Sequence, residues 1–305
     1  MSKQWQNFDE RSNTSTLLLI RWIALHLGRP VARSFLYPIS LYFFLFATPQ
    51  RKASQQYLAK VLKRKVTWLD SLKHIHAFAS TILDRVYLLT GQFSKLHIIF
   101  PDKNMPLKYN KKGIGCLLLG SHIGSFEILR SYGLQNHPLP IKILMHELQA
   151  PMMVKVLNAL NLDAADTLIT LDGSPSSLLK VKEATDQGIT VGLLGDRLMG
   201  TANEKTVTCS LLGEPVQMSS APVLIAAALD IPIIVFFGVY LGGNRYKVSF
   251  ELLADKVTLN RKTRQQDIQA YTQKYADILE KQMLETPYNW FNFYDYWQQN
   301  KQDEQ

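Results

Sequence analysis

Cysteine is scarce in this chain of 305 residues, which holds only Cys116 and Cys209. Both lie in apolar, strand-like runs, and two thiols so far apart in sequence provide neither a disulfide framework nor a metal-binding spacing. We therefore expect a reducing compartment and no metal. Charged residues are also few, at 19%, while 47% of the residues are hydrophobic, which excludes a disordered chain. The length fits one large domain, or one domain with an appendage.

Three further patterns are missing. The first 15 residues are polar and no small-residue cleavage pattern follows the first apolar run, so we expect no signal peptide. The chain lacks the Gly-x-Ser-x-Gly motif of serine hydrolases.

The apolar runs at residues 16–27 and 31–47 are interrupted by arginines and are shorter than a simple span of about 18–20 residues. They suit a pair of helices lying in a membrane interface, although two buried core helices are an alternative.

Acidic residues are nearly absent from the N-terminal segment, where residues 1–65 hold eleven Lys or Arg and only two acids. The remaining residues carry equal numbers of both signs, so the net charge of +9 lies entirely in this segment. A basic segment can bind nucleic acid or anionic lipid. Because these cations alternate with the most apolar stretch of the chain, we expect a membrane surface as the partner and no nucleic acid.

Short apolar runs alternate with helical segments after residue 114, which predicts an α/β fold with a mixed central sheet flanked by helices. Residues 1–70 would form an N-terminal membrane-associated helical segment, and residues 71–300 the α/β domain. Expected strands cover residues 114–119, 141–145, 167–171, 189–194, 207–212, 231–240 and 246–252. Expected helices cover residues 125–132, 151–160, 174–187, 218–229 and 261–285.

The stretch from Gly120 to Glu127, Gly-Ser-His-Ile-Gly-Ser-Phe-Glu, directly follows an expected strand. A histidine at the carboxyl end of a strand lies where open α/β sheets place their ligands. In one continuous helix His122 and Glu127 would point about 140° apart, so they can meet only if His122 lies in the turn and Glu127 in the first helical turn. Glu127 could then orient His122 as a general base. The alternative is a buried histidine beside a capping glutamate.

These residues resemble the lipid A secondary acyltransferase branch of the glycerolipid acyltransferase superfamily, whose signature is a histidine, four residues and an acid. The similarity continues through Val191–Arg197 (VGLLGDR), Glu214–Leu229 and Pro287–Trp297 (PYNWFNFYDYW). The segments Trp5–Arg11 and Leu36–Pro38 are similar to acyltransferases of aryl-polyene pathways. A Pro-Glu-Gly-Thr-like phosphate-binding block is absent, which argues against a glycerol-phosphate acceptor.

The resemblance implies an acyltransferase without a bound cofactor, in which His122 deprotonates an acceptor hydroxyl that attacks an acyl thioester directly. Glu127 would be the second catalytic residue. The expected oxyanion and substrate contacts are Gly120, Gly124, Asp196 and Arg197, although Asp196 and Arg197 could instead form an ordinary strand-end ion pair.

The expected partners are acyl carrier protein or acyl-CoA as donor, and a lipid or glycolipid as acceptor. The expected location is the cytoplasmic face of a bacterial inner membrane. Two other functions stay open, an acyl-thioester hydrolase and a non-catalytic membrane lipid-binding protein.

Overall fold

The computed structural model describes residues 22, 26, 28–101, 105–110, 112–129, 140–147, 154, 168–172, 174–198 and 204–297. Most of the first apolar run, almost all of the helix expected over residues 151–160, and the part after residue 129 of the helix expected over 125–132 lie outside these ranges. The segment Trp5–Arg11 does so as well.

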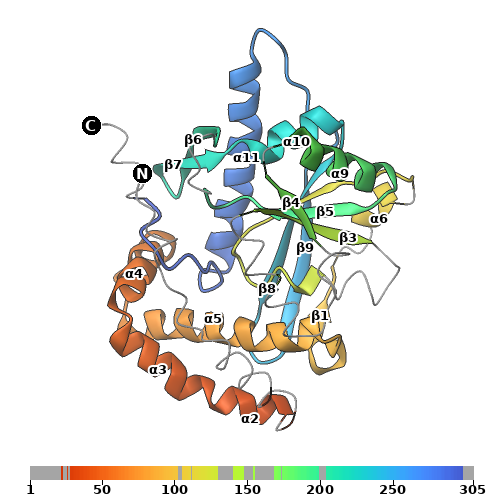
Figure 1. Cartoon of the computed structure of the whole chain (residues 1–305). Coiled ribbons are helices and arrows are strands. Elements are labelled where there is room, and N and C mark those ends of the chain that lie inside the picture. The colour runs from red at the N-terminus through yellow and green to blue at the C-terminus, as the bar shows by residue number, and fades with distance from the viewer. Residues whose placement is uncertain are drawn as a thin grey trace.

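The centre of the molecule is a seven-stranded sheet with the order β1-β9-β8-β2-β5-β3-β4 (Figure 1). Only β8 and β9 pair antiparallel; the other neighbours are parallel. The predicted mixed sheet is thus confirmed. Its strands are β1 (His97–Ile99), β2 (Leu117–Gly120), β3 (Ile141–His146), β4 (Leu168–Leu171), β5 (Thr190–Leu194), β8 (Ile233–Tyr240) and β9 (Arg245–Ala254).

The strand expected over residues 207–212 exists but does not join this sheet. It forms β6 (Thr206–Leu211), which pairs antiparallel with β7 (Glu214–Ser219) in a separate two-stranded sheet. The turn between them places Leu212 and Gly213 at positive φ, as two-residue hairpin turns of this kind require. The short strand β1 was not predicted, because three residues are too few to show a period.

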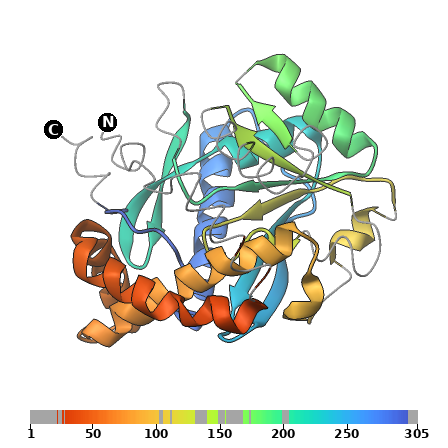
Figure 2. The same cartoon turned by 60° about the horizontal axis from the view of Figure 1, so that its bottom comes forward.

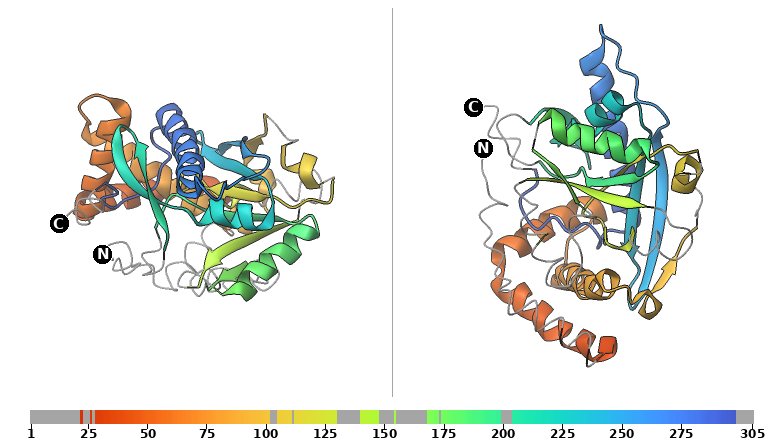
Figure 3. Two further views of the ribbon diagram at one scale, coloured as in Figure 1. Left: turned by 90° about the horizontal axis from the view of Figure 1, so that it is seen from above. Right: turned by 45° about the vertical axis from the view of Figure 1, so that its right-hand side comes forward.

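Alternate residues of the central strand β2 enter two different hydrophobic cores. Leu117 and Leu119 face a core shared with α9 (Pro175–Asp186), α10 (Ala221–Leu229) and α11 (Arg264–Glu285), whereas Leu118 faces a core shared with α5 (Trp68–Leu89) and α6 (Met105–Asn110). This alternation is the period-two geometry of a strand covered on both faces. Figure 3 shows α11 beside the β6–β7 hairpin on the first of these faces.

The N-terminal helices are α2 (Gly28–Ser34), α3 (Leu36–Phe46), α4 (Thr48–Leu62) and α5. Helix α5 runs across the lower end of the sheet in Figure 1, and α2 and α3 lie below it; Figure 2 brings this side forward. Thr67 and Asp70 form a capping box that starts α5. Tyr57 and Leu58 of α4 belong to the same core as the sheet, so packing is continuous across the predicted boundary at residue 70.

Several N-terminal cations bind other parts of the protein. Arg29 forms a bidentate ion pair with Asp84, at 2.7 and 2.8 Å, and donates to the carbonyl of Gly243. Arg33 donates to the same carbonyl at 2.6 Å, and Arg64 pairs with Asp70 of α5. The basic excess of residues 1–65 is therefore partly structural rather than wholly directed at an outside partner.

Helix α3 presents large apolar side chains to solvent. Tyr37 is 66% exposed and Phe46 70% exposed, and six more of its apolar residues, Ile39, Leu41, Tyr42, Phe43, Leu45 and the preceding Phe35, are also exposed. The second apolar run is therefore not a buried core helix. Within the described residues no single helix meets the length and hydropathy of a membrane span; residues 28–46 and 48–62 meet them together but bend by 93°.

Candidate active site

The pairing of β2 with β5 brings His122 and Asp196 together. The two strands are parallel neighbours, and Gly120 lies opposite Leu194. His122 and Asp196 each follow two residues later, so both emerge from the same edge of the sheet, where the carboxyl ends of parallel strands form ligand sites. Nδ1 of His122 lies 2.8 Å from Oδ1 of Asp196, and the backbone N–H of His122 donates to Oδ2 at 3.0 Å.

The carboxylate of Asp196 is buried and receives four hydrogen bonds. Besides the two from His122, the indole N–H of Trp290 donates to Oδ2 at 3.0 Å and the amide of Asn292 at 3.2 Å. Burial alone would raise the pKa of Asp196, but the interactions with His122 and Arg197 outweigh it and hold this pKa well below the usual range. Asp196 is therefore an anion at neutral pH.

An ionised carboxylate only accepts hydrogen bonds, so Nδ1 of His122 carries the proton and Nε2 keeps its lone pair. Burial, and then the positive charge of Arg197, lower the pKa of His122 below its ordinary value. The ring is consequently neutral at physiological pH. Its side chain remains 24% exposed, so the imidazole is accessible from outside. This is the arrangement of an oriented general base.

Glu127 is not the partner of His122. Its Oε1 lies 2.7 Å from Nε of Arg85 on α5, and its Oε2 accepts a hydrogen bond from Ser125 at 2.9 Å. No hydrogen bond or ion pair joins Glu127 to His122 in this described part of the chain. The expected contact is not made, because Arg85 and Ser125 take the two carboxylate oxygens of Glu127 while Asp196 binds Nδ1 of His122. A catalytic contribution of Glu127 by another route remains a prediction.

Gly120 and Gly124 are close-packed positions. The carbonyl of Gly120 accepts from the Tyr275 hydroxyl at 2.7 Å and from the Gly195 amide at 3.1 Å. The N–H of Gly124 donates to the carbonyl of Asn289 at 2.8 Å, and a Cβ on Gly124 would lie 2.0 Å from the carbonyl oxygen of Gly238. The Gly124 amide is thus used within the fold, and an oxyanion role for other amides around Gly120 and Gly124 remains a prediction.

Arg197 is held by the closing segment, the C-terminal aromatic run of residues 287–297. Its Nε donates to Oδ1 of Asn292 at 2.5 Å and its Nη2 to the carbonyl of Phe291 at 3.0 Å, and its guanidinium lies over the ring of Tyr294. Asp196 and Arg197 therefore each bond to other groups rather than forming a simple strand-end pair. Contact of Arg197 with a substrate remains a prediction.

A comparison of the sequence with known families identifies the chain independently of this geometry. Residues 95–299, more than half of the chain, match the family described as bacterial lipid A biosynthesis acyltransferase. The chain belongs to this family. It is an acyltransferase, and its family indicates a lipid acceptor. A search of curated proteins found no match to the chain.

The closing segment of this lipid A acyltransferase family member holds site residues that sequence reasoning did not single out. Trp290 and Asn292 bond to Asp196, and the N–H of Phe291 donates to the carbonyl of His122 at 2.8 Å. This run stood out in the sequence only through its similarity to the acyltransferase family. The alternation of aromatic rings with two asparagines, Asn289 and Asn292, was the available signal, because buried amides need specific partners.

The acyltransferase shows no activated nucleophile among the groups predicted to lie nearby. Cys116 is fully buried, and burial raises the pKa of its thiol to about 12. The hydroxyl of Ser121 accepts from the N–H of Ile123, and that of Ser125 donates to Glu127. Across the described residues, no three His, Cys, Asp or Glu side chains gather into a metal-binding group.

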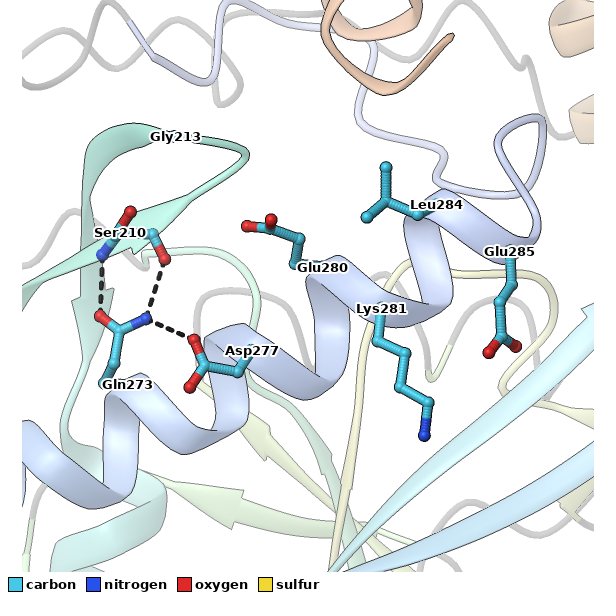
Figure 4. A pocket seen from close by; sticks show the side chains of 8 residues that line it. All are labelled: Ser210, Gly213, Gln273, Asp277, Glu280, Lys281, Leu284 and Glu285. Carbon is cyan, nitrogen blue, oxygen red and sulfur yellow. Dashed lines mark hydrogen bonds between the residues drawn. The ribbon is translucent and has the colours of Figure 1, made fainter. Parts of the chain in front are cut away.

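A hollow of about 570 Å³ lies elsewhere on this acyltransferase, between the β6–β7 hairpin and α11 (Figure 4). Gln273 bonds to both backbone groups of Ser210 there, and Asp277 and Glu280 give it an acidic lining. None of its lining residues belongs to the group around His122. We therefore do not place the reaction in this hollow.

Proposed function

We propose that the protein moves a fatty-acyl group from an acyl thioester, carried by acyl carrier protein or coenzyme A, to a hydroxyl of a lipid or glycolipid. His122 accepts the proton of that hydroxyl through Nε2, and the alkoxide oxygen attacks the thioester carbonyl. The thiolate of the carrier leaves as the ester forms. The observation that carries this proposal is the bond between Nδ1 of His122 and the buried carboxylate of Asp196.

Asp196 supports the reaction in two ways. Its carboxylate fixes the tautomer in which Nε2 is the base, and its charge stabilises the imidazolium that forms when the proton is taken up. The hydrogen bonds from Trp290 and Asn292 hold this carboxylate in place. The pair thus performs the work that was expected of His122 and Glu127.

The state of the neighbouring hydroxyls and thiol supports direct transfer. An acyl-enzyme requires a nucleophile within reach of the base and free to react. Cys116 lies inside β2, and the hydroxyls of Ser121 and Ser125 are occupied by contacts within the loop. Donor and acceptor must then be bound together, so that proximity supplies part of the rate acceleration.

The location we propose is the cytoplasmic face of a bacterial inner membrane, with α3 against the lipid. Support comes from the exposed aromatic and aliphatic side chains of α3 and from Lys52, which is exposed near the start of α4 and so close to the end of α3. Apolar side chains flanked by cations match the chemistry of an anionic lipid surface. The aryl-polyene type of acceptor stays a prediction that rests on sequence similarity alone.

The test is acyl transfer by the purified protein in lipid vesicles. Wild type, His122→Ala and His97→Ala would each receive an acyl-carrier-protein or coenzyme A thioester, with and without a bacterial lipid extract. We expect a new acyl lipid only with wild type and His97→Ala, detected by mass spectrometry. Release of free fatty acid without any acylated lipid would establish a hydrolase instead, and transfer by His122→Ala would refute the role of His122.

A further inference from the structure

Arg85 of α5 lies beside the loop that carries His122. Its Nε atom is 2.7 Å from Oε1 of Glu127, which is an ion-pair distance without the alignment of a hydrogen bond, and the Glu127 side chain is only 11% exposed. The other oxygen of Glu127 accepts the hydroxyl hydrogen of Ser125 at 2.9 Å. The Glu127 carboxylate therefore joins α5 to two positions of the His122 loop, residues 121–129.

The same loop is attached elsewhere through its backbone. The N–H of Gly124 donates to the carbonyl of Asn289, and the N–H of Ser125 donates to the carbonyl of Gly238 in β8, both at 2.8 Å. These bonds fix the loop to the sheet and to the closing segment. The ion pair of Arg85 with Glu127 fixes it to the helix below the sheet.

We propose that Arg85 is a positioning residue of the acyl-transfer reaction: its ion pair with Glu127 holds the His122 loop against α5 in the geometry that the base requires. The inference rests on the proposed function, because it assigns Glu127 to Arg85 within that same site. Arg85 precedes the residues that match the acyltransferase family, 95–299. The family match therefore carries no information about it.

Helix α5 is itself anchored at this point. Asp84 and Arg85 are neighbours in sequence, and successive side chains of a helix point about 100° apart. Asp84 accordingly binds Arg29 of α2, while Arg85 binds Glu127. The buried ion pair of Asp84 with Arg29 thus fixes the helical turn from which Arg85 reaches Glu127.

The charge of Arg85 also reaches the imidazole. The charged groups around His122 are Arg85 on α5, Asp196 and Arg197 after β5, and Glu127 on its own loop. Burial is the main cause that lowers the pKa of His122; Arg197 lowers it further, Asp196 opposes this, and Arg85 adds a smaller lowering. Removing Arg85 should therefore raise this pKa as well as loosen the loop.

A double-mutant cycle tests the pair. Arg85→Ala and Glu127→Ala should each reduce kcat by about 10- to 100-fold, the effect of a base displaced by a fraction of an ångström to one ångström. The double variant should lose no more than the worse single variant, since both remove one link. Lys180→Ala, which removes an exposed cation from α9, should keep wild-type kcat. Losses that multiply in the double variant would overturn the proposal.

A second readout separates this inference from the proposed function. The pH dependence of His122 modification by diethyl pyrocarbonate, followed by peptide mass spectrometry, reports the protonation of the ring without any turnover. We expect the midpoint to rise in Arg85→Ala and to stay at the wild-type value in Lys180→Ala. An unchanged midpoint together with wild-type kcat would refute the role of Arg85. A raised midpoint in a protein that transfers no acyl group would refute the proposed function alone.

If Arg85→Ala does not fold, Arg85→Lys makes the same comparison. Lysine keeps the positive charge but cannot place a nitrogen where Nε of the guanidinium lies. We expect kcat to fall while the modification midpoint stays near the wild-type value. Wild-type kcat in Arg85→Lys would show that the position of the Arg85 nitrogen is irrelevant to the reaction and would overturn the proposal.

Discussion

At the scale of single residues, Asp196 decides the chemistry of His122. Its carboxylate accepts from Nδ1 and leaves Nε2 as the base. In Asp196→Asn the amide could donate to Nδ1, which would place the ring proton on Nε2 and remove the base. We predict a loss in kcat on the order of 10³-fold or more, by analogy with other carboxylate-oriented histidines. The measurement is the rate of acyl transfer under saturating donor and acceptor.

Asp230→Asn is the matched control, because Asp230 forms an exposed ion pair with Lys256 far along the chain. It should leave kcat unchanged. Unfolding midpoints of both variants would show whether a loss of activity reflects a loss of fold. An Asp196→Asn enzyme that is folded and retains a tenth or more of wild-type kcat would contradict the assigned role.

The pH dependence also belongs to this scale. Burial and the charge of Arg197 lower the pKa of His122 below 6.5, and the base works only when unprotonated. We predict that kcat/KM is constant at neutral pH and falls only at pH values below the ordinary histidine pKa of 6.5. A fall in kcat/KM that is centred above pH 7 and caused by protonation of His122 would be inconsistent with this environment.

Circular dichroism over the same pH range is the control for this experiment. His74 is buried and neutral, and burial lowers its pKa to about 4. Its folded-state pKa is below its unfolded value, so the stability it contributes is present above about pH 6.5 and is lost as the pH falls toward 4. Activity data are interpretable only where the fold persists.

The residues of the site could be found from the sequence, but not their pairing. His122 and Asp196 each stand out because each follows a buried apolar run. That they meet depends on β5 lying beside β2, although 69 residues separate the end of β2 from the start of β5 in the chain. Glu127 was assigned to His122 because it is close in sequence, whereas its partner Arg85 lies on an earlier helix. Local spacing carries no information on such long-range contacts.

At the scale of elements, the pair of Arg29 with Asp84 joins α2 to α5. The side chains are 10% and 0% exposed, and the hydroxyl of Tyr246 donates to the same carboxylate at 2.9 Å. Removing one partner leaves a buried charge without compensation. We predict that Arg29→Met lowers the free energy of unfolding by about 3–5 kcal/mol, measured by urea denaturation.

The matched control breaks an exposed pair. Lys182→Met removes the partner of Asp186 on α9, where both side chains are about half exposed or more, and should cost less than about 1 kcal/mol. Combining Arg29→Met with Asp84→Leu should recover part of the loss, because no charge is then left buried. Equal losses of unfolding free energy in Arg29→Met and Lys182→Met would show that the buried ion pair stabilises the fold no more than the exposed one.

Helix α3 carries the prediction of membrane binding. Deleting residues 15–50 would also remove Arg29 and so disturb the fold, which makes surface substitutions the cleaner experiment. The triple variant Tyr42→Ser, Phe43→Ser, Phe46→Ser should lose most binding to anionic vesicles in sedimentation, because these side chains are exposed and apolar burial drives such binding. Leu179→Ser on α9, equally exposed, should bind as wild type does. Binding that survives the triple variant would place the contact elsewhere.

Elements were easier to predict than their assembly. The helix expected over 174–187 and the strands over 141–145 and 167–171 were predicted within one or two residues of α9, β3 and β4, since period and turn residues mark them. The strand expected over residues 207–212 was assigned to the wrong sheet. Sheet membership depends on packing against α11, and the sequence of β6 alone, with its alternating burial, fits either position.

At the scale of the whole molecule, three parts of the fold support one site. The sheet supplies His122 and Asp196, the closing segment holds the carboxylate, and α5 holds the loop through Arg85 and Glu127. The helices that expose apolar side chains pack on the same α5. Helix α5 therefore joins the surface proposed to contact lipid to the site proposed to acylate it.

The central claim is that the acceptor hydroxyl attacks the thioester directly, with both substrates bound. Initial-rate kinetics with donor and acceptor varied together test it most directly. We predict double-reciprocal lines that intersect, because a ternary complex forms before any product leaves, and no acyl adduct on the protein incubated with donor alone. Parallel lines, with a burst of released thiol and a matching mass increase on Ser121, Ser125 or Cys116, would contradict the account.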